Sequence, residues 1–249
     1  MACTETGLST HALDIRDLHL ALGGRPVLQG IDLKLPPGEF LALAGPNGSG
    51  KSSLLRCIAG LLPAQRGTIL ICSHAIAADT AAARAKFGMA VDPAALPGLL
   101  TGRECLQLFA RTRGLGKVPA ATLALAEALR YSPYLDRPVE EYSLGTRQKL
   151  AVLLGLIGEP PLLLLDEPLN GLDPPSAWAL KRHLADLAAR GTAIVLATHA
   201  IELAERHVHR AVLLVDGRMR LDLDRAALAL LRADPERSLE AELVAAMGA

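Results

Sequence analysis

A glycine-rich segment at residues 45–52 constrains the possible fold more than any other part of the sequence. It matches the pattern G-x-x-x-x-G-K-[ST] and reads Gly45-Pro46-Asn47-Gly48-Ser49-Gly50-Lys51-Ser52. A short apolar run, Phe40–Ala44, precedes it, and Leu54, Leu55 and Ile58 follow at helical spacing. Glycines let the backbone curl so that successive N–H groups point at one phosphate, and a helix N-terminus adds its positive end. The segment therefore predicts a strand, a phosphate-binding loop and a helix, in that order.

This loop predicts a nucleoside triphosphate and Mg²⁺ as ligands. Lys51 is expected to bridge the β- and γ-phosphates, and the Ser52 hydroxyl to hold Mg²⁺. We expect the other loop residues, together with Ser53 directly after them, to contact the phosphates.

A second acidic segment supplies the remaining chemistry. Four leucines at 162–165 lead into Asp166 and Glu167, which places both carboxylates at the carboxyl end of a buried strand, where open α/β sheets bind ligands. Asp166 suits Mg²⁺ through water, and Glu167 suits polarising the water that attacks the phosphate.

The other apolar patterns predict an α/β fold with two additions to its core. Short strands are expected at residues 13–22, 31–35, 40–44, 68–72, 162–165, 193–197 and 212–215, with Asp216-Gly217 closing the last strand. The early segments are expected to form an N-terminal antiparallel β subdomain, and the wholly apolar later ones a mostly parallel sheet. Between residues 87 and 158 the apolar residues recur at helical spacing, which predicts an inserted helical subdomain.

Three further motifs resemble those of the ATP-binding cassette (ABC) family. One is a segment that resembles a relaxed form of the family's signature motif LSGGQ; it reads Tyr142-Ser143-Leu144-Gly145-Thr146-Arg147-Gln148-Lys149. Asn170-Gly171-Leu172-Asp173 resembles the D-loop, and Thr198-His199 resembles the switch histidine. The similarity covers about residues 13–220 and leaves residues 221–249 as a C-terminal helical extension.

The resemblance implies a P-loop ATPase that converts ATP and water to ADP and phosphate with Mg²⁺. It assigns catalytic roles to Lys51, Glu167 and His199. It also implies that Ser143, Gly145 and Asp173 contact ATP held by a second cassette, either an identical copy or a relative, so that two subunits close around two ATP molecules. Ser143 and Gly145 precede an apolar stretch, so they would offer a hydroxyl, amides and a helix dipole to an anion.

Two positions depart from the family pattern. Leu22 stands just before Gly23, where many relatives carry an aromatic residue that stacks on adenine, so weaker base stacking is expected. Asp92 stands where the Q-loop glutamine is expected. A carboxylate can still coordinate Mg²⁺ or orient water, but coupling to a partner would change.

Charge argues against nucleic acid as a partner, and hydropathy argues against a membrane span within this chain. The 26 basic and 26 acidic residues cancel, so no broad positive field is available for nucleic acid. The longest apolar stretches, 150–157 and 162–165, are separated by Glu159-Pro160-Pro161 well before the roughly 20 residues that span a bilayer. Any membrane spans are expected in another subunit.

The cysteines and two histidines are expected to carry no chemistry. Cys3, Cys57, Cys72 and Cys105 form no C-x-x-C pair, so they are interpreted as reduced thiols in a cytoplasmic protein. His207 and His209 have no acidic or cysteine partner at ligand spacing, so they are expected to be solvated.

The leading hypothesis is the ATPase subunit of a membrane transporter, cytoplasmic and peripheral at the inner face of the cell membrane through a separate permease. One rival is an ABC protein that works without a membrane, in repair, translation or cofactor assembly. Another is a degenerate cassette that binds nucleotide structurally, although Lys51, Asp166, Glu167 and His199 are all present.

Overall fold

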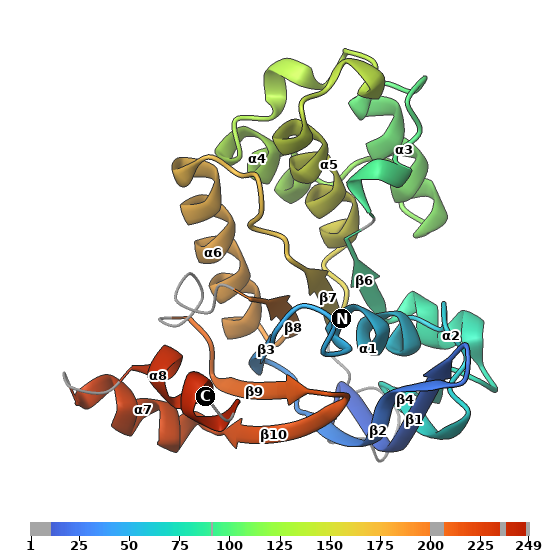
Figure 1. The fold of residues 1–249 in the computed structure, drawn as a ribbon. Helices are drawn as coiled ribbons and strands as arrows, with labels where there is room; N and C mark the ends of the chain where they lie inside the picture. Colours follow the sequence, from blue (N-terminus) through green and yellow to red (C-terminus); the bar gives the residue numbers. More distant parts are fainter. Residues whose placement is uncertain (1–10, 91, 200–206, 235–237, 248–249) are drawn as a thin grey trace.

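The computed structural model describes residues 11–90, 92–199, 207–234 and 238–247 of the chain (Figure 1). The strands are β1 Leu13–Leu22, β2 Arg25–Leu35, β3 Phe40–Ala44, β4 Arg66–Ile71, β5 His74–Ala75, β6 Phe87–Met89, β7 Leu162–Asp166, β8 Ala193–Thr198, β9 Arg210–Val215 and β10 Arg218–Leu223. The helices are α1 Lys51–Ile58, α2 Thr80–Ala85, α3 Gly102–Thr112, α4 Ala120–Ala128, α5 Leu144–Leu156, α6 Pro174–Ala189, α7 Arg225–Ala233 and α8 Leu239–Ala246. Short 3₁₀ turns lie at Pro93–Ala95, Ser132–Tyr134 and Val139–Glu141.

A mostly parallel sheet of order β10-β9-β3-β8-β7-β6 forms the centre of the fold. Strands β3 and β8 are buried along their whole length, and β7 is buried up to its final residue, because their near-continuous apolar sequences pack on both faces. In the parallel pairing, Ala44 lies opposite Thr198, and Asp166 lies opposite Ala197. The segments that follow these three strands therefore emerge at one edge of the sheet.

A second, antiparallel sheet of order β2-β1-β4-β5 is built from the N-terminal part of the chain. The predicted fold class is confirmed, with the parallel sheet, the N-terminal antiparallel sheet and helices inserted between β6 and β7. Figure 1 shows α3, α4 and α5 gathered at one end of the molecule, away from the antiparallel sheet. Within the described residues, no helix is both long enough and apolar enough to cross a membrane.

The expectation that residues 212–215 form the last strand is wrong. Asp216 and Gly217 have φ values of 50° and 70°, which suit a two-residue hairpin turn, and the chain returns as β10 antiparallel to β9. The Asp-Gly pair was therefore a hairpin signal and not a stop. Strand β10 runs to Leu223, across the limit of 220 drawn from the family resemblance.

Two expectations about side chains are also corrected. Cys57 and Cys105 are free, buried thiols, but Cys72 is disulfide-bonded, so the prediction of reduced cysteines is wrong there; Cys3 lies outside the described residues. His209 is not solvated, because the Phe40 N–H donates to its Nδ1 at 3.2 Å, and burial lowers the pKa of its imidazole. His207 is partly buried.

The inserted helices and the central sheet make a close backbone contact. A Cβ atom placed on Gly88 of β6 would overlap the carbonyl oxygen of Gly155 in α5 and would also press on Pro160. A Cβ atom placed on Gly155 would in turn meet the backbone of Ala90 at 2.7 Å. Glycine is needed at both positions because helix α5 approaches the sheet this closely.

We predict that Gly88→Ala lowers the free energy of unfolding by about 1–3 kcal/mol, because the added methyl group would overlap a backbone carbonyl oxygen, which cannot move aside as a flexible side chain can. Urea denaturation followed by circular dichroism measures it. Gly116→Ala is the matched control, since nothing lies within 4 Å of its Cβ, and it should change stability by less than about 0.5 kcal/mol. Equal stability of the two variants would contradict the close approach.

Candidate functional site

The phosphate-binding loop connects β3 to α1 and depends on three glycines with positive φ. Gly45, Gly48 and Gly50 have φ values of 151°, 82° and 110°, which side chains rarely tolerate. A Cβ on Gly45 would also overlap the Leu214 carbonyl oxygen. Gly50 is the N-cap of α1, so the loop ends on free N–H groups at the positive end of that helix.

Lys51 is held at the base of the loop. The residue is only 6% exposed, and its Nζ donates to the carbonyl oxygens of Gly45 at 2.6 Å and Pro46 at 3.1 Å. Desolvation lowers the pKa of this ammonium, and the nearby charges of Glu167 and Asp166 oppose that effect. The loop thus carries a fixed cation facing two carboxylates.

A cavity of about 200 Å³ lies against this loop and is lined by most of the predicted loop residues. Its lining is Val27, Asn47, Gly48, Gly50, Lys51, Ser52, Ser53, Asp166 and Glu167. Gly45, Pro46 and Ser49 do not line it; Ser49 is buried, and its hydroxyl has no hydrogen-bond partner in the described structure. Val27 of β2 was missed, because only the long-range packing of the antiparallel sheet brings it there.

Glu167 and His199 are brought together at the ends of neighbouring strands. Glu167 adopts a positive φ of 46°, and its N–H donates to the Ala197 carbonyl at 2.9 Å. Its Oε1 accepts from the His199 N–H at 2.9 Å and lies 2.7 Å from Nδ1 of the imidazole. The Thr198 hydroxyl donates to Oε2 at 3.2 Å. These contacts fix the carboxylate beside the loop and the histidine beside the carboxylate.

The residues of the signature-like and D-loop-like segments form a separate unit. Ser143 caps α5 by accepting from the Thr146 N–H at 3.2 Å. A Cβ on Gly145 would overlap the Gly171 carbonyl oxygen, so the two segments touch through their backbones. Lys149 donates to Asp173 at 2.7 Å and, through this hydrogen bond, holds the pKa of that carboxyl well below its usual range. Ser143, Gly145 and Asp173 do not line the cavity at the loop.

Asp92 and Leu22, the two departures, lie outside this cavity. The Asp92 carboxylate accepts from the Ala94 N–H at 2.9 Å and caps the 3₁₀ turn that follows β6. Leu22, the last residue of β1, is 45% exposed. Neither lines the cavity in this structure.

The residues present fit a nucleotide-bound Mg²⁺ better than a metal held by protein alone. No group of three or more His, Cys, Asp or Glu side chains in the described ranges could hold a metal ion. The Ser52 hydroxyl and the Asp166 carboxylate line the same cavity as the loop. Mg²⁺ is commonly bound by one or two such oxygens together with phosphates and water.

Comparisons with known proteins identify a family that matches more than half of the chain. The family model described as ABC transporter matches residues 28–170. The chain is 37% identical to ATP-binding cassette sub-family A member 7 of Rattus norvegicus over 84% of its own length but only 10% of that protein. It is 34% identical to Nod factor export ATP-binding protein I of Paraburkholderia xenovorans over 83% of its own length and 69% of that protein.

Solved structures share the fold. The ATP-binding subunit of an ABC transporter superposes with a TM-score of 0.85 at 30% identity, over 96% of this chain and 100% of that one. A dimeric ATP-binding cassette in a post-hydrolysis state with ADP and Pi has a TM-score of 0.76 at 24% identity, over 86% of this chain and 98% of that one.

We predict that Lys51→Ala weakens ATP binding by at least about 1.5–3 kcal/mol, the range for a hydrogen bond to a charged group, and abolishes hydrolysis. Isothermal titration calorimetry and a phosphate-release assay measure the two effects. Lys117→Ala, in an exposed loop, should match the wild type in both. Wild-type turnover by Lys51→Ala would refute the role of this ammonium.

Leu22→Tyr should raise the affinity for ATP by about 1–3 kcal/mol, since a ring at this position adds a stacking surface for the base. The wild type should bind ATP and GTP with similar affinity. Titration of both nucleotides against both proteins tests this. A clear preference of the wild type for ATP would mean that another residue contacts the base.

Proposed function

The chain belongs to the ABC transporter family, and from this premise we propose that its ATPase cycle powers transport of a substrate across a membrane through a separate permease subunit. The observation that carries the proposal is the convergence of the phosphate loop, Asp166-Glu167 and His199 at one edge of the parallel sheet. Such an edge is where open α/β folds bind ligands.

For the reaction we propose that ATP and water become ADP and phosphate through positioning and charge neutralisation. The N–H groups of the loop and the Lys51 ammonium hold the phosphates. Ser52 and Asp166 would hold Mg²⁺, which would neutralise charge on the phosphates. Glu167 polarises the attacking water and takes its proton. His199 keeps the Glu167 carboxylate in place through the 2.7 Å contact.

We further propose that a second cassette completes the site. Ser143, Gly145 and Asp173 lie off the cavity of their own chain, but Ser143 opens α5 and Asp173 opens α6. The N-terminus of α5 can therefore face an anion bound to another subunit. Helix α6 begins with Pro174 and Pro175, which carry no N–H, and the Ser176 N–H already donates to Asp173, so this helix end offers no free donor. The dimeric cassette among the similar folds is consistent with this arrangement. The partner would be a second copy or a related cassette.

The proposed place of work is the inner face of the cell membrane, bound to the permease. Names of the relatives support transport, and the Nod factor protein is named for export, which favours export here. We propose that the cassette covers about residues 13–220, with its helical subdomain at about 87–158. The extension proposed for residues 221–249 is helical only after β10 ends at Leu223. We also propose that Asp92, which directly precedes the 3₁₀ turn after β6, orients water or Mg²⁺ when the cassette closes. Co-purification of a permease from a detergent extract would support this assignment over one that works without a membrane.

We predict that Glu167→Gln binds ATP with Mg²⁺ but hydrolyses it at least about a hundredfold more slowly, because the amide keeps the shape and loses the basic carboxylate. The trapped protein should be a dimer with ATP and a monomer with ADP or without nucleotide. Size-exclusion chromatography with light scattering measures this.

The double variant Lys51→Ala/Glu167→Gln is the matched control and should stay monomeric, since it lacks the cation that holds ATP. A monomeric Glu167→Gln protein with ATP would count against a homodimer and favour a different partner cassette. Rapid turnover by this variant would remove Glu167 from the catalytic role.

A further inference from the structure

A cleft between α4 and α6 lies apart from the nucleotide motifs. One cavity of about 360 Å³ opens between these helices and the end of α5, and a second of about 560 Å³ adjoins it along α4 and α6. Residues shared by the two linings are Ala121, Leu125, Glu159, His183 and Arg190. The volumes fall in the range of small-molecule sites. No residue of the phosphate loop, the signature-like segment or the D-loop-like segment lines either cavity.

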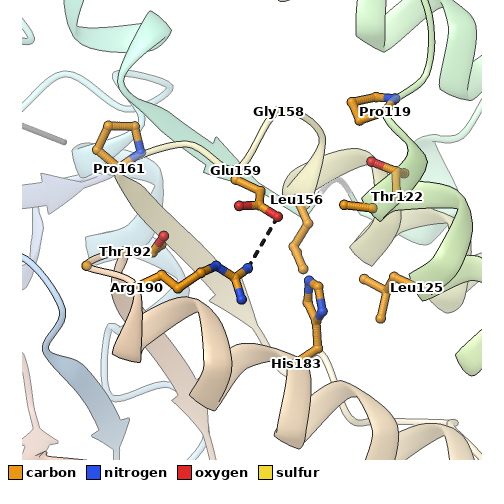
Figure 2. Close-up of a pocket in the computed structure, with 12 residues that line it drawn as sticks. Pro119, Thr122, Leu125, Leu156, Gly158, Glu159, Pro161, His183, Arg190 and Thr192 are labelled. Carbon is orange, nitrogen blue, oxygen red and sulfur yellow. Dashed lines mark hydrogen bonds and ion pairs between the residues drawn. The ribbon is translucent and has the colours of Figure 1, made fainter. Parts of the chain in front are cut away.

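The lining of the cleft combines apolar side chains with polar and charged ones. Leu125 of α4 and Leu156 of α5 face each other across the first cavity (Figure 2). In the second cavity, Trp178 of α6 lies under the Arg182 guanidinium, 4.8 Å from the ring centroid. An apolar side chain of a ligand could contact Leu125 and Leu156 in the first cavity.

His183 points from α6 into the cavity toward Leu156 (Figure 2). Desolvation lowers the pKa of its imidazole; Glu159 and Asp186 oppose this effect, and Arg190 adds to it. Within the described residues the structure gives the ring no hydrogen bond or ion pair. Burial therefore disfavours the charged form of an imidazole whose ring nitrogens can hydrogen-bond a ligand.

Glu159 and Arg190 form an ion pair over the mouth of the cavity, with 3.3 Å between Nη2 and Oε1 (Figure 2). Their side chains are 42% and 52% exposed, so the pair is screened and easily opened. Glu159 has a φ of 45°, directly after Gly158 at 79°.

The charges that line the cleft cancel. Glu159 and Asp186 are opposed by Arg182 and Arg190. A ligand with one net charge would upset this balance, whereas a zwitterion would preserve it. A ligand carboxylate could bind the guanidinium of Arg190 in a bidentate contact, and a ligand ammonium could bind the Glu159 carboxylate. The ion pair between Glu159 and Arg190 would then be replaced by two charge-assisted contacts with the ligand.

We propose that this cleft binds a free α-amino acid with an apolar or aromatic side chain. Its carboxylate lies on Arg190, its ammonium on Glu159, and its side chain between Leu125 and Leu156. His183 donates or accepts one further hydrogen bond to the ligand.

The single tryptophan of the chain makes the binding test direct. Trp178 is the only tryptophan in the sequence and lines the adjoining cavity, so its fluorescence reports on the cleft. The nucleotide-free full chain is titrated with L-leucine, L-methionine and L-phenylalanine, by fluorescence and by isothermal titration calorimetry. We expect saturable binding of at least one of them. Isocaproate, which lacks the ammonium of leucine, and isoamylamine, which lacks its carboxylate, should bind at least about tenfold more weakly.

Two variants separate the two charged contacts. Glu159→Gln should weaken amino-acid binding about tenfold and leave isocaproate unchanged, while Arg190→Gln should weaken amino-acid binding and leave isoamylamine unchanged. Glu127→Gln, an exposed position on α4 that lines neither cavity, is the matched control and should bind like the wild type.

The proposal is overturned if none of the three amino acids binds by either method. It is also overturned if isocaproate and isoamylamine bind as tightly as leucine, or if Glu159→Gln behaves like Glu127→Gln. Because no nucleotide is present, these results do not depend on the ATPase assignment.

Discussion

Parallel hydrogen bonding between β3, β8 and β7 is the constraint on which the site depends. It sets Ala44 opposite Thr198 and Asp166 opposite Ala197, so three loops that are far apart in the sequence leave the sheet together. The side chains that follow then need only short local contacts, such as those from Glu167 to His199 and Thr198. A one-residue change of register in either strand pair would displace the carboxylate from the loop.

The parts of this arrangement that could be predicted from the sequence are those with a local cause. The Gly-Lys-Ser loop, the leucine run before Asp166 and the Ser143 cap each carry their signal within a few residues, and each lies in the expected element. Val27 carries no such signal, because the packing of the antiparallel sheet, and not the local sequence, brings β2 to the cavity. His209 was misjudged for the same reason, since its partner Phe40 lies 169 residues away.

The α4–α6 cleft shows a further limit of sequence motifs. Its polar groups come from the end of α5 and from α6, and its apolar wall from α4 and α5, so no spacing along the chain unites them. Sequence spacing likewise does not unite Ser143 and Asp173 with the nucleotide loop, because the ATP that they are proposed to contact is bound by a second cassette. Sites formed by convergence in space, or between subunits, leave only separate residues in the sequence.

The contact between Gly88 and Gly155 bears on how such chains can diverge. One hydrophobic core runs from Phe40, Leu163 and Ile194 of the sheet to Leu106 and Ala126 of the inserted helices, and the glycine contact joins both parts at the backbone. The inserted helices are therefore not an interchangeable module. If these helices were replaced by those of a relative, β6 and the face of the sheet that they contact would have to be replaced with them. Substitutions in the helices and in the sheet therefore have to remain compatible with each other.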